Sequence, residues 1–315
     1  MLRPSVFAGV SFQPSKGPAM LFVLRFVFPF ALAILFFPQH LLAEEAGAKG
    51  DSAETKGGEA GEPFDAEHIF GFVDGSDIGE KGEQEIESVT VGRFGRIGSY
   101  NNAANETSYR NTLTDNIRLS FGTETDYYNI HNVAGYGNIS AATFSGLTAE
   151  FRVNVLNRAT SAFGMSISFN PEWRQFDPDS GARAQNYALP VTLLLDKELI
   201  EQKFFAGSSL SYAPSFLRVN NSFEHDDSLT VTSAGSYQVV RNIFAAAEIR
   251  HENTAVNGNV TAHALYVGPS IYYKVLPNLS VKVAWAAQIP DVAARSLDLT
   301  TYDRNQFELH LSYGF

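Results

Sequence analysis

The sequence predicts an all-β protein: a transmembrane antiparallel up-and-down β-barrel of about 12 strands, preceded by a signal peptide and a flexible acidic leader. Three observations lead to this prediction. An amphipathic strand ends on an aromatic residue at the carboxyl terminus, an export signal stands at the amino terminus, and strand-like segments fill the chain from residue 86 onward. The expected organisation is a signal peptide over 1–43, a partly disordered periplasmic leader over 44–85, and the β-barrel over 86–315.

The last nine residues alternate between apolar and polar side chains. Because successive side chains of a strand point to opposite faces, this segment has one apolar and one polar face. The apolar face consists of Phe307, Leu309, Leu311, Tyr313 and Phe315. This ending resembles the C-terminal strand of Gram-negative outer-membrane barrels, whose final aromatic residue is read by the barrel-assembly machinery. The resemblance implies that these five residues form the assembly signal and that the machinery is a partner.

The amino terminus has the parts of a secretory signal peptide. Residues 1–43 contain three basic residues and no acidic one, and an apolar run over 26–37 precedes the expected cleavage point after Ala43. A transmembrane helix is the alternative, but the run is short for a bilayer and is broken by Pro29 and Pro38. Export is therefore expected, whether translation starts at Met1 or at Met20.

Residues 44–85 form a leader with thirteen acids and three lysines. Its first part, 44–63, is rich in Gly, Ala, Glu and Lys and offers almost nothing apolar to bury, so we expect a flexible tether. The patch from Glu67 to Glu80 has a more ordered composition. Its acids do not have EF-hand spacing, so an acidic turn is predicted there. Since the negative charge is concentrated in the leader, a nucleic-acid partner has no support.

From residue 86 onward the chain consists almost entirely of strand-like runs. Several alternate clearly, with apolar residues facing one side and polar residues the other. A membrane barrel requires this pattern because lipid lies outside and a polar lumen within, although a soluble sandwich can alternate too. The predicted strands lie near 87–96, 105–112, 117–130, 145–156, 162–174, 184–197, 201–214, 226–240, 243–253, 260–275, 278–290 and 305–315.

The links between these strands alternate between short and long. Outer-membrane barrels have short periplasmic turns and longer external loops, so the alternation favours a barrel with both ends in the periplasm. The chain has no cysteine, and a closed barrel can be stable through hydrogen bonds and burial alone. The short links lie near 113–116, 157–161, 197–200, 241–242 and 276–279, and the long ones near 97–104, 131–144, 175–183, 215–225, 254–259 and 291–304.

A family resemblance accompanies this pattern. The leader patch from Ile69 to Glu83, followed by Val91-Gly-Arg-Phe-Gly95, is similar to the entry segment of an uncharacterised family of proteobacterial outer-membrane barrels. The similarity extends through the barrel and includes the segment from His263 to Ser270. It implies a barrel fold and a location in the bacterial cell outer membrane, with membrane lipid as a partner, and it brings no activity.

Charged residues recur on the polar face of the predicted strands. Glu150 and Arg152, Glu172 and Arg174, and Glu248 and Arg250 each place an acid and a base two positions apart. Two interpretations stay open: salt bridges that fill and stiffen the interior, or a charged constriction that selects small solutes. The candidates for lining a pore are Arg118, Glu150, Arg152, Glu172, Arg174, Glu248, Arg250, Lys282, Glu308 and His310.

Enzyme chemistry finds little support. Only His310 and Ser312 have the His-to-Ser spacing of outer-membrane lipid hydrolases, and their parity points them inward, away from lipid. The seven histidines are scattered, so neither a metal nor another cofactor is predicted. The sequence thus favours a passive channel for small hydrophilic solutes that is not an enzyme. A closed structural or adhesive barrel is the alternative, a lipid hydrolase is less favoured, and the oligomeric state stays open.

Overall fold

The structure is a computed structural model that describes residues 66–219, 222–256, 258–290 and 295–315. The predicted signal peptide and leader residues 44–65 lie outside this part. Across the described residues, fourteen β-strands join in one antiparallel sheet, and no helix there is long and apolar enough to cross a membrane. The strands are β1 (Gln84–Phe94), β2 (Ser99–Thr114), β3 (Ile117–His131), β4 (Ile139–Leu156), β5 (Gly164–Phe169), β6 (Glu172–Phe176), β7 (Arg183–Ala188), β8 (Val191–Ile200), β9 (Phe204–Val219), β10 (Ser222–Val240), β11 (Ile243–Val256), β12 (Asn259–Leu276), β13 (Leu279–Ile289) and β14 (Asn305–Gly314).

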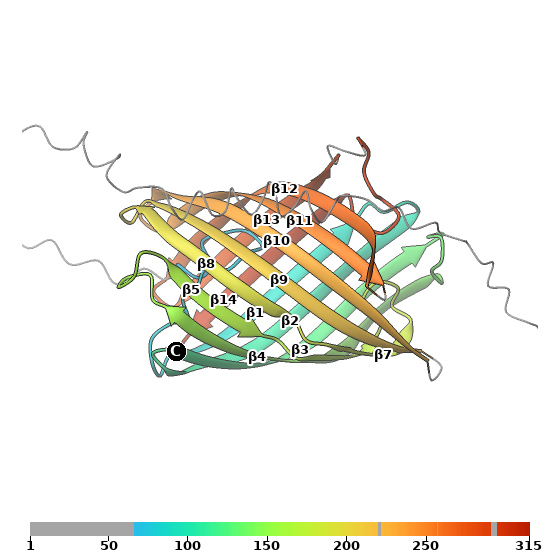
Figure 1. Cartoon of the computed structure of the whole chain (residues 1–315), viewed down its shortest axis with the longest axis horizontal. Coiled ribbons are helices and arrows are strands. Elements are labelled where there is room, and N and C mark those ends of the chain that lie inside the picture. Colours follow the sequence, from blue (N-terminus) through green and yellow to red (C-terminus); the bar gives the residue numbers. More distant parts are fainter. Residues whose placement is uncertain (1–65, 220–221, 257, 291–294) are drawn as a thin grey trace, which may run out of the picture.

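The sheet closes on itself into a barrel (Figure 1). β1 pairs with β2 on one side and with β14 on the other, in a register from Glu85 opposite Gly314 to Phe94 opposite Asn305. Two barrel strands are interrupted: β5 and β6 follow each other along β4, and β7 and β8 follow each other along β9. Each interruption contains a proline, Pro171 or Pro190, which cannot donate a ladder hydrogen bond. The barrel therefore has twelve strands, as predicted.

The two rims of the barrel differ in their connections. Gln84 and Gly314 lie at one rim, which we call the terminal rim, and tight turns join β2 to β3, β10 to β11 and β12 to β13 there, as predicted. The opposite rim, which we call the loop rim, carries the links that were expected to be long. Some are shorter than expected, since β9 extends to Val219 and β10 begins at Ser222. Polar residues form ladder hydrogen bonds as well as apolar ones do, so pairing continues beyond the segment that the alternating pattern marks.

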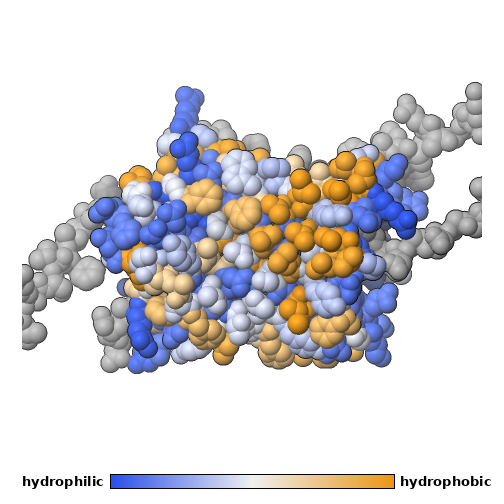
Figure 2. Space-filling model, turned by 180° about the vertical axis from the view of Figure 1, so that it is seen from behind, coloured by the Kyte–Doolittle hydropathy of each residue, from blue (hydrophilic) through white to orange (hydrophobic). Residues whose placement is uncertain are grey.

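Side chains alternate across the wall in the predicted sense. On β13, Val283 and Trp285 are 39% and 43% exposed, whereas Lys282 and Ala284 are each 2% exposed. Figure 2 shows apolar side chains gathered on the outer face, with hydrophilic residues toward the ends of the barrel. An apolar outer face around a polar interior is what the hydrocarbon core of a bilayer requires of a spanning barrel.

This facing leads to a test on two adjacent residues of β13. If Val283 lies at the membrane midplane, the Val283→Arg variant should lower the free energy of unfolding by about 2–4 kcal/mol, because it places a charge against lipid. Ala284→Ser, on the inner face, should have a much smaller effect. Denaturant unfolding in lipid vesicles measures both, and equal losses would contradict the assigned facing.

Candidate functional site

The lumen is occupied by residues 66–83, which we call the plug. Its contacts reach strands around the whole wall, including Arg118 on β3, Asp196 on β8, Ser236 on β10 and Lys282 on β13. The leader was expected to lie in the periplasm, and this part of it lies inside the barrel instead. The reason is compositional: the plug contains several apolar side chains that need a buried environment, together with acids that find basic partners on the inner wall.

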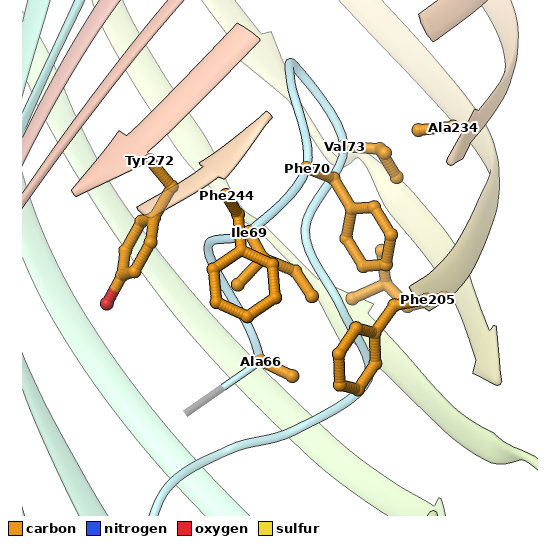
Figure 3. Packing of buried hydrophobic residues seen from close by; sticks show 9 residues of the cluster. Ala66, Ile69, Phe70, Val73, Phe205, Ala234, Phe244 and Tyr272 are labelled. Atoms are coloured by element: carbon orange, nitrogen blue, oxygen red, sulfur yellow. The ribbon is translucent and has the colours of Figure 1, made fainter. Parts of the chain in front are cut away.

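One side of the plug is apolar. Ile69, Phe70 and Val73 are buried and pack against Phe205 and Phe244, which point inward from β9 and β11 (Figure 3). The wall leaves room for the plug at Gly207, where a Cβ atom would lie 2.9 Å from the Phe70 ring. This close approach requires glycine, because any larger residue would displace the aromatic ring.

The other side of the plug is ionic and centres on Glu67. Arg118 donates to both carboxylate oxygens, at 2.6 and 2.7 Å, and Arg152 and Arg110 donate to Oε1 at 2.7 and 3.2 Å. Burial by itself would raise the pKa of the Glu67 carboxyl, but the guanidinium groups of Arg118 and Arg152 outweigh it and lower that pKa to about 2. One carboxylate of the plug thus compensates charges from three adjacent strands.

A second set of polar contacts holds the plug between Ile69 and Asp77. Asp74 lies 3.5 Å from Lys282 Nζ and 3.7 Å from Arg152, and Arg158 donates to Asp77 at 2.7 Å. Backbone groups are bound as well: the Ser236 hydroxyl donates to the Ile69 carbonyl at 2.7 Å, and the Ser76 amide donates to Asp196. Side chains of the wall therefore supply hydrogen-bond partners to backbone groups of the plug, which contains no strand.

A histidine of the plug meets a histidine of the wall. His68 Nε2 lies 3.0 Å from Glu87 Oε1 on β1, His310 Nε2 on β14 lies 3.4 Å from the same oxygen, and the two rings are 4.5 Å apart. Burial would lower the pKa of His68, but the neighbouring carboxylates of Glu67 and Glu87 raise it well above its usual value. A positive charge at this position is therefore favoured.

The structure brings the predicted charged residues together on the inner wall. The three expected acid–base pairs all form, at 2.7 Å for Glu150 and Arg152, 3.6 Å for Glu172 and Arg174, and 3.9 Å for Glu248 and Arg250. Lys282 pairs with Glu308 at 3.0 Å. Most of these residues lie around the plug, whereas Glu172 and Arg174 lie nearer the loop rim, where Arg174 pairs with Glu124.

Sequence reasoning did not identify the residues that join plug and wall. Glu67, His68 and Asp74 were assigned to an acidic turn of the leader, and Glu87 and Arg110 were not singled out. A signal was present, because Ile69, Phe70 and Val73 stand in an otherwise polar leader, while Phe205 and Phe244 occupy lumen-facing positions. Of the His–Ser pair considered for lipid hydrolysis, Ser312 contacts Glu85 and His310 contacts Glu87. The two residues therefore have different partners inside the lumen.

Cavities lie on both sides of the plug. The outer cavity of about 430 Å³ lies at the loop rim, next to a middle cavity of about 350 Å³ that reaches Phe72 and Asp74 of the plug. An inner cavity of about 680 Å³ lies at the terminal rim and reaches Glu67 and Ile78. No described residue lines both the middle and the inner cavity, so the plug separates them. The outer and middle cavities share Glu172, Pro190, Thr230 and Glu252.

Comparison with known proteins places the chain in a family. The model of a family of unknown function, DUF6662, matches residues 62–315. The chain belongs to this family. The matched region begins just before the plug, so plug and barrel together make up the family's domain. No curated protein sequence matches the chain.

Solved structures that are similar to this chain include porins and an autotransporter β domain, all three described below at low sequence identity. The KdgM porin is 13% identical with a TM-score of 0.42, over 73% of this chain and 99% of its own. The NanC porin is 9% identical with a TM-score of 0.45, over 72% and 98% of the two chains. The β domain of the Bordetella autotransporter BrkA is 9% identical with a TM-score of 0.49, over 75% and 100%. These likenesses concern the fold alone.

The Glu67→Gln variant should loosen the plug without unfolding the barrel. Removing this charge leaves the Arg110, Arg118 and Arg152 guanidinium groups short of a buried partner, which should cost about 3–5 kcal/mol of docking free energy. Hydrogen exchange of the amides of residues 66–78 measures the loss. Glu80→Gln, at an exposed position of the same segment, is the matched control. Unchanged protection in Glu67→Gln would show that the ion pairs do not hold the plug.

Acidification should weaken docking in the same way. The Glu67 pKa is depressed in the docked state, so the stability it contributes is fully present above the ordinary value of 4.5 and is lost as the pH falls toward 2. Asp74, whose pKa is lowered well below 3.8 against the effect of burial by Lys282 and His68, acts in the same direction. Exchange rates of the plug, corrected for their intrinsic pH dependence, should rise below about pH 4.5. Constant protection down to pH 2 would contradict this assignment.

Proposed function

We propose that this protein is a channel of the bacterial outer membrane for small hydrophilic solutes, closed in its resting state by its own plug. The observation that carries the proposal is a polar lumen filled by a segment that is joined to the wall covalently through β1 but forms no strand with it. A space that holds a folded peptide segment is wide enough for small solutes once that segment leaves.

The contacts of the plug favour a closure that can open. They are mostly ion pairs and hydrogen bonds to side chains, together with the small apolar cluster around Phe70. When the plug leaves, water can enter the polar lumen and solvate the exposed charges, so the cost of separation is far below that of a dry interior. A strand paired within the sheet has no such route, because its backbone groups would lose their partners at membrane depth.

The charges of the outer cavity indicate which solutes would enter. Three arginines line it, Arg93, Arg96 and Arg174, against a larger number of acids, so the entrance has a negative potential that attracts cations over anions. Deeper in the lumen, Glu150, Arg152, Glu248 and Arg250 would line the path of the open channel. The acids of the outer cavity are Asp126, Glu172, Asp177, Asp179, Asp226, Asp227, Glu252 and Asp303.

The closed structural or adhesive barrel is the second candidate. It is favoured by the density of paired charges around Glu67, which would stiffen the interior whether or not a solute ever passes. The two functions differ in one measurable respect. A plugged channel conducts after the plug is removed, whereas a structural barrel needs no continuous path through its lumen.

Planar-bilayer conductance of three refolded proteins tests the proposal. The full chain should be closed for most of the time, and deletion of residues 66–83 should produce a steady open state, because the cavities on the two sides of the plug then merge. Deletion of residues 44–63, which leaves the plug in place, is the matched control and should behave like the full chain.

The open state of the plug-deleted barrel should prefer cations, as a reversal potential under a salt gradient would show. A folded, heat-modifiable barrel that lacks residues 66–83 and passes no current would overturn the channel and leave the structural barrel. If the deletion prevents folding, the Glu67→Gln variant of the full chain provides the same comparison through an increased open probability.

A further inference from the structure

Two imidazoles and a carboxylate meet where the plug touches the seam of the barrel. His68 belongs to the plug, Glu87 to β1 and His310 to β14, and all three are almost completely buried. The pairing of β1 with β14 sets Val89 opposite His310, so Glu87 and His310 are diagonal neighbours on the inner face. One residue of the cluster therefore comes from the plug, and two come from the strands that close the barrel.

The donor atoms already have the spacing of a metal site. In a tetrahedral zinc site with metal–ligand distances of about 2.0–2.1 Å, adjacent donors are about 3.3 Å apart. Here Glu87 Oε1 lies 3.0 Å from His68 Nε2 and 3.4 Å from His310 Nε2. All three donor atoms lie within 4.8 Å of one another, so small rotations of the side chains would complete the third edge.

The three atoms contact one another as ion-pair partners. Among the described residues, none of the three makes a hydrogen bond of good geometry, although all three are buried. Buried polar atoms are normally hydrogen-bonded. A bound ion would accept the lone pairs of all three atoms at once.

The surroundings orient the same atoms toward a shared point. Asp74 Oδ1 lies 3.6 Å from His68 Nδ1, on the side of the imidazole from which a carboxylate can hold the ring with Nε2 directed at a metal. Arg110 pairs with Glu87 Oε2 and leaves Oε1 between the imidazoles. Glu67, Asp74 and Glu87 all lie within 4 Å of the His68 ring nitrogens, which offsets the positive charges of Arg110 and Lys282 nearby.

We propose that His68, Glu87 and His310 bind one divalent transition-metal ion, such as Zn²⁺, and that this ion holds the plug to β1 and β14. Two imidazole nitrogens and one carboxylate suit zinc and its neighbours, whereas calcium and magnesium prefer all-oxygen sites. Water fills the fourth position. Binding displaces the proton that the surrounding carboxylates otherwise favour on His68, so metal uptake releases protons. The site requires a docked plug but does not depend on whether the channel ever opens.

Cobalt titration of the refolded, metal-free full chain tests the site directly. Co²⁺ should bind at about one ion per chain with the visible absorption of tetrahedral coordination, and Zn²⁺ should displace it. The His68→Gln and His310→Gln variants should each lose this absorption. His131→Gln, at the loop-rim end of β3, should retain it.

A second readout covers variants that fail to fold. In the wild-type barrel, Zn²⁺ should slow hydrogen exchange of residues 66–78, and a chelator should reverse the effect. A folded wild type that binds no cobalt, or a His68→Gln variant that binds it unchanged, would overturn the metal site. Because neither readout involves conductance, a barrel that binds metal but never conducts would count against the channel alone.

Discussion

The structure depends on the requirement that charges inside a closed barrel be paired. Arg110, Arg118 and Arg152 extend from three adjacent strands into the same part of the lumen and converge on Glu67. Glu87 and Glu150 of the wall pair with the same arginines, so without Glu67 three guanidinium groups would share two carboxylates. The leader thus supplies the third acid, and plug and wall form one electrostatic unit.

The apolar residues of the inner wall also fit the shape of the plug. A water-filled lumen calls for polar side chains, yet Phe205, Phe244 and Tyr272 point inward and are buried. Gly207 lies among them and leaves space for the Phe70 ring. These residues would expose apolar surface to water in an empty lumen, so burial against the plug explains why they occupy inward positions. The barrel sequence is therefore adapted to an occupied lumen.

Much of the fold could be predicted because a membrane wall imposes a period of two on the sequence. From that period we could predict the twelve strands and which face of the wall residues such as Val283 and Lys282 occupy. It also showed that Glu150 and Arg152 share the inner face. It could not show what fills the lumen, since parity gives the face of a residue but not its partner across the barrel. Residues 66–83 of the leader were misassigned because the many acids and glycines of the leader outweighed a few apolar residues in the average composition. Long-range pairs such as Glu67 with Arg118 join residues 51 positions apart and leave no periodic signal in the sequence.

The energetic character of the plug follows from the balance between its two sides. Water can solvate the charges of the ionic side once the lumen is hydrated, and protonation of Glu67 or Asp74 weakens this side further. The apolar side behaves differently, because exposing Phe70 and Ile69 to water is unfavourable whatever the pH or ionic strength. A plug held by charges alone would leave too readily, and one held by a large apolar core would stay permanently. The small apolar cluster beside an extensive ionic network lies between these limits, which is the combination that the proposed channel requires of a segment that closes the lumen and can leave it.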